Sequence, residues 1–242
     1  MVGVVLLVHM NFNIITIFPS IFDSYFNESI IKRAQARQVI DINIHNLRDW
    51  TTDRHKTVDD TPYGGGAGMV LKVEPIYRCV EDIKLQITNN KFQINSKSKS
   101  YKLKTKMRVI LFSAKGKKYT HSDAKRLSKY ENLILICGRY EGVDERVAKY
   151  IADEEISIGD YVLTGGEIPA MAVVDSITRL IPEVLGNVES IKDESHSRSG
   201  YLEYPQYTKP EDFMGHKAPK VLLSGNHEEI RKWRMKHAKK GK

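Results

Sequence analysis

The chain has 242 residues, 41% hydrophobic and 28% charged, which is typical of a globular protein with its own core. Its two cysteines show no CxxC or Cys/His spacing and no HExxH motif occurs, so we expect a reduced, cytoplasmic protein that holds no structural zinc or catalytic metal. The net charge of +8 is concentrated in residues 91–108 and 215–242, which favours nucleic acid as a partner, although either cluster alone reads equally well as a solvated lysine-rich segment.

Residues 1–9 are apolar but too short to span a membrane, and no later run reaches eighteen apolar residues. They also lack the basic start and the small-residue cleavage site of a secretory signal. We therefore expect an N-terminal extension without function and no membrane segment.

The first half of the chain alternates between strand and helix patterns. Strands are predicted at 13–18 and at 39–47, where isoleucines alternate with polar residues. A helix is predicted from Pro19 onward, with Ser20 and Asp23 as a capping pair, and another over Glu74–Leu85.

Two polar segments interrupt this pattern. Residues 48–69 form a long loop rich in glycine, which could close over a substrate or be an ordinary surface loop. Residues 86–106, rich in Asn, Ser and Lys, are interpreted as a low-complexity insertion.

The second half continues the alternation up to a polar linker at 187–200. Strands are predicted at 108–113, 133–137 and 156–158, and helices at 120–130, capped by Thr120 and Asp123, and from Thr164 to Leu180. A last helix begins near Asn226 in a small basic region, 201–242. Strands alternating with helices predict an α/β fold with a mostly parallel sheet.

Two glycine clusters follow the apolar runs 133–137 and 156–158. Gly138 comes directly after the first run, and Gly159, Gly165 and Gly166 follow the second. Ligands in such folds bind beyond the carboxyl ends of the strands, and glycine lets the backbone approach them closely. The pair of clusters favours a backbone-lined pocket over simple chain turns.

Four long motifs resemble the bacterial tRNA (guanine-37-N1)-methyltransferases of the knotted SPOUT class. They are TVDDTPYGGGAGM at 57–69, GRYEGVDER at 138–146, EISIGDYVLTGGEIPAM at 155–171 and LLSGNHEEIRKWR at 222–234. The resemblance runs from about Asn11 onward. It implies a deep trefoil knot in the domain 10–186 and tRNA binding by a small helical domain, 201–242.

The resemblance also implies that the protein binds S-adenosylmethionine and acts as a homodimer with composite active sites. The cofactor residues that it implies are Leu111, Phe112, Ser113, Gly138, Tyr140, Glu141, Ile158, Gly159, Asp160, Tyr161, Val162, Leu163, Gly165, Gly166 and Pro169. Ala114 departs from the family, which commonly has proline there. For tRNA it implies Arg54, His55, Arg231, Arg234 and Lys236. Mg²⁺ is possible in the reaction, but no protein motif holds it.

Methylating N1 of guanine needs a base for the N1 proton and a cation for the charge that develops on O6. Arg179 stands at the family's catalytic arginine, although the sequence alone favours a surface salt bridge. The family's catalytic aspartate aligns with Glu194, and Asp193 is a rival one residue earlier. Both are also readable as solvated linker acids.

The resemblance predicts methylation of N1 of guanosine-37 in tRNAs that carry guanosine at position 36. One alternative is a non-enzymatic RNA-binding protein on the same fold, in which the glycine loops are structural. Another is a related methyltransferase acting on other RNA, which would lack the DTPYGGG sequence at 60–66.

Overall fold

A computed structural model describes residues 9–94, 106–185, 194–198 and 200–240. The chain divides into two compact units, residues 1–185 and 186–242, and each is described by itself. Within the described residues, no helix combines the length and the apolar character needed to cross a membrane.

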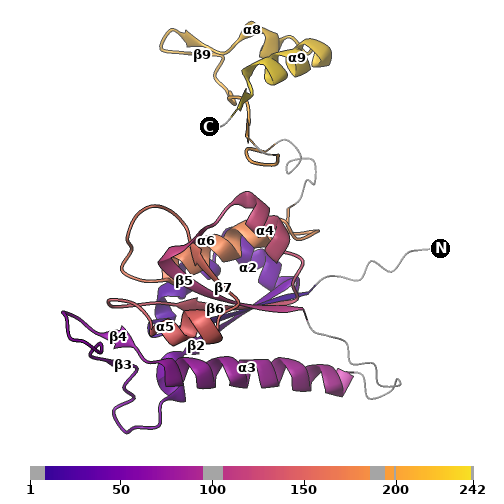
Figure 1. Cartoon of the computed structure of the whole chain (residues 1–242). Helices are drawn as coiled ribbons and strands as arrows, with labels where there is room; N and C mark the ends of the chain where they lie inside the picture. Colours follow the sequence, from indigo (N-terminus) through magenta and orange to yellow (C-terminus); the bar gives the residue numbers. More distant parts are fainter. Residues whose placement is uncertain (1–8, 95–105, 186–193, 199, 241–242) are drawn as a thin grey trace. The chain divides into compact units, whose positions relative to one another are not determined.

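The first unit is built on a five-stranded sheet whose strands are all parallel (Figure 1). In spatial order the strands are β2 (Ile40–Asn46), β1 (Met10–Thr16), β6 (Asn132–Cys137), β5 (Met107–Lys118) and β7 (Glu154–Ser157). Strand β6 is buried along its whole length because it lies at the centre. The predicted α/β class with a mostly parallel sheet is confirmed.

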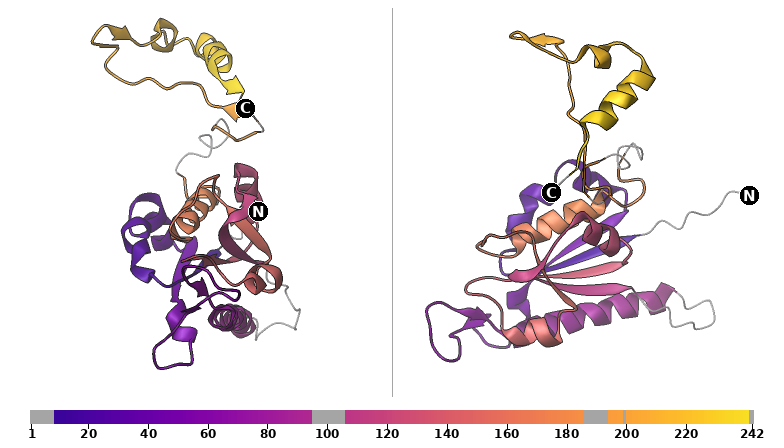
Figure 2. Two further views of the ribbon diagram at one scale, coloured as in Figure 1. Left: turned by 60° about the vertical axis from the view of Figure 1, so that its left-hand side comes forward. Right: turned by 45° about the horizontal axis from the view of Figure 1, so that its top comes forward.

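Helices cover both faces of this sheet (Figures 1 and 2). One face carries α2 (Ser29–Ala36), α4 (His121–Leu127) and α6 (Glu167–Thr178), packed on Phe12, Leu133 and their neighbours. The other carries α3 (Val73–Ile94), α5 (Glu145–Tyr150) and the short η2 (Leu47–Trp50), packed on Ile15, Ile134 and Ile136. Alternate residues of β1 and β6 thus belong to two separate cores, which explains why residues 133–137 of β6 form a continuous apolar run.

The prediction of one continuous helix from Pro19 is wrong. The segment forms three separate helices, η1 (Pro19–Phe22), α1 (Asp23–Phe26) and α2, and Ser20 does not act as a cap. Glu28 is extended and Ser29 has a φ of 50°, so no helix can run through this point. Phe22 and Phe26 still face the core, with their rings stacked at 5.3 Å.

The helix predicted over 74–85 is longer than expected. Helix α3 continues to Ile94, into the segment interpreted as an insertion, because Ile87 extends the apolar stripe of Ile83 onto the core. The rest of that segment up to residue 105 lies outside the described residues.

Strand β5 is also longer than the prediction of 108–113, because the chain crosses beside β7 and pairs with it a second time. Ile110 and Leu111 pair with Glu154 and Glu155, and after a break Lys117 pairs with Ile156. Gly116 lies at this crossing, where a Cβ would come within 2.6 Å of the Ile156 backbone. Only glycine fits such an approach.

Thr120 and Asp123 cap α4 as predicted, forming a capping box. Burial raises the pKa of Asp123, but hydrogen bonds from Lys117, Thr120 and Arg126 outweigh it and lower the pKa to about 2. A carboxylate with a lowered folded-state pKa stabilises the fold above its unfolded pKa of about 4.

We therefore expect this contribution to be lost as the pH falls from about 4 toward 2. Asp123→Asn should show a weaker dependence of unfolding free energy on pH in that window than the wild type, measured by urea unfolding at several pH values. A matched change at the exposed Asp23 should leave the curve nearly as in the wild type.

The second unit contains short strands and helices: β8 (Tyr201–Leu202), β9 (Asp212–Phe213), β10 (His216–Lys217), α8 (Lys220–Leu223), α9 (His227–His237) and β11 (Lys239–Lys240). Asn226 caps α9 as predicted, accepting hydrogen bonds from the backbone of Glu228 and Glu229. The Trp233 ring is stacked on His237 at 4.0 Å and partly buried, while Arg231, Arg234 and Lys236 are exposed.

Candidate functional site

A pocket of about 420 Å³ lies at the carboxyl ends of β5, β6 and β7. Most of its lining comes from residues 111–115 within β5, the loop 138–143 after β6, and the loop 158–166 between β7 and α6, and residues of α5, β7 and α6 complete it. This is the edge at which a parallel sheet binds its ligands. The two glycine loops therefore face one pocket, as the sequence predicted.

All but one of the residues predicted to bind a cofactor line this pocket. The exception is Asp160, which is exposed and pairs with Lys118 at 2.6 Å between Nζ and Oδ2. Ala114, the departure from the family, also lines it.

The glycines of these loops let two backbone segments approach each other closely. The Gly166 N–H donates to the Gly138 carbonyl at 2.9 Å. A Cβ at Gly166 would lie 2.6 Å from Cys137 Cα, and one at Gly138 would lie 3.3 Å from the Phe112 carbonyl oxygen. Tyr140, by contrast, has a φ of 61°, an uncommon value for a residue with a side chain. The loops thus pack backbone against backbone, and larger residues would separate them.

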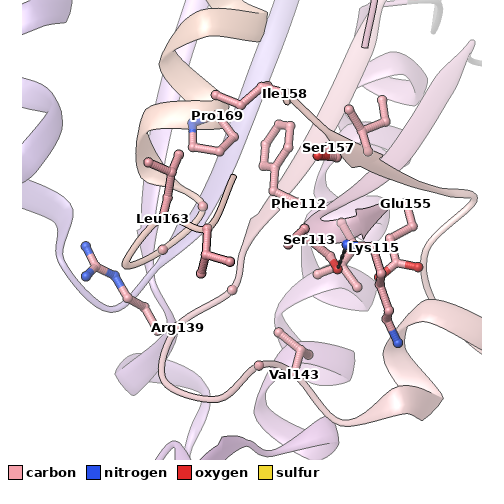
Figure 3. Close-up of a pocket in the computed structure, with 18 of the residues that line it drawn as sticks. Phe112, Ser113, Lys115, Arg139, Val143, Glu155, Ser157, Ile158, Leu163 and Pro169 are labelled. Atoms are coloured by element: carbon pink, nitrogen blue, oxygen red, sulfur yellow. Dashed lines mark hydrogen bonds between the residues drawn. The ribbon is translucent and has the colours of Figure 1, made fainter. Parts of the chain in front are cut away.

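The pocket is apolar at one end and polar at another (Figure 3). Phe112, Ile158, Leu163 and Pro169 gather at the apolar end. Ser113, Lys115 and Glu155 lie together on the polar side, where the Ser113 hydroxyl accepts a hydrogen bond from the Lys115 backbone at 3.2 Å. Such a lining suits a ligand with a flat apolar part and a polar, charged part.

Carboxylates dominate the polar side of the pocket. Glu145 binds the Lys115 ammonium, which raises the pKa of that lysine. Glu155 is different, because its Oε1 is buried and has no hydrogen-bond partner among the residues that the structure describes. A buried acceptor without a partner is costly, so this oxygen fits a ligand that brings a donor or a positive charge.

A buried ion pair ties the two glycine loops together. Arg139 Nε donates to Glu167 Oε2 at 3.0 Å, and the Thr16 hydroxyl donates to Glu167 Oε1 at 2.8 Å. Glu167 is only 2% exposed. The Arg139 guanidinium also lies 4.7 Å from the centroid of the Phe18 ring, turned away from the pocket (Figure 3).

Arg139→Ala is expected to lower the unfolding free energy by about 3–5 kcal/mol, because it leaves the Glu167 carboxylate buried without its cation. Urea unfolding measures the loss. Arg146→Ala is the matched control, since its partner Asp144 sits at the surface and such a pair contributes about 0–1 kcal/mol. Equal losses in the two variants would contradict a structural role for the buried pair.

Residues 57–69, part of the long loop predicted at 48–69, lie against the loop after β6. The backbone of Glu141 donates to the Met69 carbonyl at 3.0 Å, and β4 (Val70–Leu71) is held by the Gly142 carbonyl. A Cβ at Gly68 would collide with the Glu141 side chain. Arg54 and His55 are exposed in a turn before β3 (Asp59–Asp60), where Asp53 accepts hydrogen bonds from Thr57.

The predicted catalytic residues belong to different units. Arg179 caps the end of α6 in the first unit. Near it, Asp175 accepts a hydrogen bond from the Tyr25 hydroxyl, an interaction that raises the pKa of Tyr25 to about 12. Glu194 is partly buried in the second unit, and Asp193 lies outside the described residues.

The predicted cofactor residues leave out several that line the pocket, among them Val143, Glu155 and Ser157. Glu155 lies directly before the strand predicted at 156–158, and the structure includes it in β7. Among the residues that the structure describes, no group of three or more His, Cys, Asp or Glu side chains could hold a metal ion.

Comparisons with known proteins agree over nearly the whole chain. The model of the family described as tRNA (Guanine-1)-methyltransferase TrmD matches residues 10–241. A tRNA (guanine-N(1)-)-methyltransferase of Dictyoglomus turgidum is 52% identical over 231 residues, covering 96% of this chain and 86% of the relative. Relatives of the same name from Citrifermentans bemidjiense and Clostridioides difficile are each 50% identical, over 94% and 95% of this chain and 84% and 92% of their own lengths.

Proposed function

The chain belongs to the tRNA (guanine-1)-methyltransferase family, and from this we propose that it transfers the methyl group of S-adenosylmethionine to N1 of guanosine-37 in tRNA. The observation that carries the proposal is the pocket at the ends of β5, β6 and β7, formed by the motifs on which the resemblance was first based. Methylation of tRNA is consistent with a cytoplasmic location.

The pocket fits the proposed cofactor in shape and charge. S-adenosylmethionine supplies a methyl group bound to a positively charged sulfur. The apolar end formed by Phe112, Ile158, Leu163 and Pro169 suits the flat adenine ring, and backbone groups of the glycine loops can bind its polar edge. Glu155 Oε1, which is buried and without a hydrogen-bond partner in the described part of the chain, suits a donor or the positive charge of such a ligand.

We propose that the carboxylate of Glu194 accepts the N1 proton, with Asp193 as the rival base. The guanidinium of Arg179 stabilises the negative charge that develops on guanine O6. A carboxylate within hydrogen-bond reach of N1 can accept this proton as the methyl group is transferred. A guanidinium is always charged and can donate two hydrogen bonds to a carbonyl-type oxygen.

We further propose that the first unit forms the trefoil knot of the family. The crossing of the chain beside β7 supports this, with Gly116 against the Ile156 backbone. The contact of Gly166 with the backbone of Cys137 and Gly138 supports it as well, because it brings the loop before α6 against the end of β6.

The proposed enzyme is a homodimer with active sites shared between subunits. Exposed apolar side chains on η1, α1 and α6 support this: Ile21 is 38% exposed, Tyr25 42% and Ile168 55%. Tyr25 is joined to α6 through Asp175, so these elements form one face of the unit. Such an apolar face is typical of a protein interface.

Ile168→Asp is expected to shift sedimentation at micromolar concentration from dimer toward monomer and to reduce methyl transfer, because it places a charge in the apolar face. Tyr150→Asp is the control, since Tyr150 is 80% exposed on α5, which covers the opposite face of the sheet. A wild-type monomer with full activity would remove the dimer from the proposal.

Transfer of labelled methyl to unmodified tRNA tests the proposed function. We expect transfer to tRNAs with guanosine at both 36 and 37, and much less when either nucleotide is changed. If the protein binds such tRNA but transfers nothing from S-adenosylmethionine, the alternative of a non-enzymatic RNA-binding protein gains support. Transfer to ribosomal RNA alone would support the other alternative.

A further inference from the structure

Strand β7 carries two consecutive glutamates whose side chains meet different surroundings. Glu154 has both carboxylate oxygens bound, Oε1 to Arg108 Nε at 3.0 Å and Oε2 to Arg126 Nη2 at 2.7 Å. Successive side chains of a strand point to opposite faces, and Glu155 lines the pocket at the ends of β5, β6 and β7. Its Oε1 is buried and accepts no hydrogen bond from the described part of the chain.

The interaction that Glu155 lacks is a hydrogen bond rather than an opposite charge. The Lys115 ammonium binds Glu145, and its pKa is raised by Glu145 and, more weakly, by the charge of Glu155. A cation therefore already lies near the Glu155 carboxylate. No N–H or O–H group of the described residues reaches Oε1, and a buried acceptor in this state costs free energy until a donor binds it.

Glu155 lies close to the apolar end of the pocket. Its Cα pairs with that of Leu111 in the β5–β7 register, one residue before Phe112 of the apolar end. Figure 3 shows its side chain on the polar side of the pocket, across from Leu163 and Pro169. In an adenosyl ligand the ribose is joined directly to the adenine ring. With the ring at the apolar end, the ribose hydroxyls are therefore the first O–H donors toward the polar side.

We propose that Glu155 binds the ribose of the cofactor, with Oε1 accepting a hydrogen bond from the 2′- or the 3′-hydroxyl. The proposal rests on the proposed function and adds to it a residue for the sugar, outside the set that the resemblance implies. In dinucleotide-binding α/β folds an acidic residue likewise binds a ribose hydroxyl. The sulfonium of S-adenosylmethionine has no N–H or O–H to donate, and its amino group lies at the end of a flexible chain.

Binding of 5′-methylthioadenosine to the full chain, measured by calorimetry, tests this assignment. The compound keeps adenine and ribose but lacks the charged sulfur and the amino-acid part. We expect Glu155→Ala to weaken its binding about 10–100-fold, because a hydrogen bond to a charged group is lost. The 2′-deoxy and 3′-deoxy forms complete a double-mutant cycle. For the form without the bound hydroxyl, the wild type and Glu155→Ala should differ by less than about threefold.

The larger ligands separate the ribose from the other groups that Glu155 could bind. With the ribose as its partner, Glu155→Ala weakens S-adenosylhomocysteine and S-adenosylmethionine by the same factor as methylthioadenosine. A loss for S-adenosylmethionine alone would place Glu155 at the sulfonium, and a loss for both but not for methylthioadenosine would place it at the amino group. Either result would overturn the proposal, as would a full loss that persists with both deoxy forms.

Glu145→Gln is the matched control for Glu155→Gln. Glu145 also lines the pocket, but its carboxylate already binds Lys115, and glutamine can still accept that hydrogen bond. We expect a change of less than about threefold at Glu145, whereas Glu155→Gln, which keeps an acceptor without the charge, should lie between the wild type and Glu155→Ala. Equal losses at the two positions would indicate a general effect of charge and contradict the proposal.

Stability without ligand separates binding from a structural role. Glu155→Gln should not lower the free energy of unfolding of the ligand-free protein, because Oε1 has no hydrogen bond within the described residues to lose. Urea unfolding measures this. A clear loss of stability together with unchanged affinity for methylthioadenosine would assign Glu155 to the fold instead.

The result is separable from the methyl-transfer assay. If methylthioadenosine binds through Glu155 but no methyl group reaches tRNA, the proposed function fails and the ribose site stands. If methyl transfer is normal and Glu155→Ala keeps the wild-type affinity for all of these compounds, the ribose site fails and the proposed function stands.

Discussion

Glu194→Gln is expected to lower the single-turnover rate of methyl transfer by roughly 10²–10⁴-fold at saturating cofactor and tRNA. Glutamine has nearly the same size and can keep hydrogen bonds, but it cannot accept the N1 proton. Affinity for the cofactor and for tRNA should change little, because the interaction that is removed belongs to the transition state. Rapid-quench measurement of the methylated product gives the rate directly.

The neighbouring Asp193→Asn is the decisive control. Glu194 is one methylene longer than the aspartate of the family, so a shift of one residue in the chain would bring Asp193 to the same point. If Asp193→Asn is crippled while Glu194→Gln is near normal, the base is Asp193. If both variants retain the wild-type rate, neither residue is the base, and the proton must leave by another route.

Gly166→Ala is expected to weaken S-adenosylmethionine binding by about 10–100-fold, since forcing an extra carbon into a packed site costs about 1–3 kcal/mol. The added Cβ would lie 2.6 Å from Cys137 Cα and 2.9 Å from the Gly138 nitrogen. Both atoms belong to the backbone at the end of the central strand, so neither can move without displacing the pocket. Calorimetry measures the affinity, and circular dichroism with urea unfolding checks the fold.

Gly159→Ala provides the comparison within the same pocket. A Cβ there would meet the Tyr161 ring, but that ring is 56% exposed and can rotate away. We expect a smaller loss of affinity than at Gly166. A folded Gly166→Ala variant with unchanged affinity would show that the packing of the two glycine loops against each other does not shape the cofactor site.

The local patterns of the sequence predicted the elements that form the pocket. The apolar run at 133–137 and the following Gly138 placed a buried strand and its loop correctly, because a fully buried parallel strand is apolar on both faces. The capping residues Thr120 and Asn226 were also predictable, since a cap depends on residues within three positions. The break at Ser29 was not, because its backbone angle departs from the helical pattern of the side chains.

Contacts between distant residues were beyond the sequence pattern. Thr16 and Glu167 are 151 positions apart and meet only because β1 and α6 pack together. The buried Glu155 Oε1, which has no hydrogen-bond partner within the described residues, likewise depends on packing that the local sequence does not specify.

Mapping the methylated atom tests the central claim most directly. A methyl group at N1 lies on the pairing edge of guanine, so it blocks reverse transcription of the tRNA one nucleotide before position 37. We predict a stop there that depends on both the protein and S-adenosylmethionine and that disappears when guanosine-37 is replaced. Labelled tRNA that is read through position 37 without a stop would place the methyl group on another atom and contradict the proposed function.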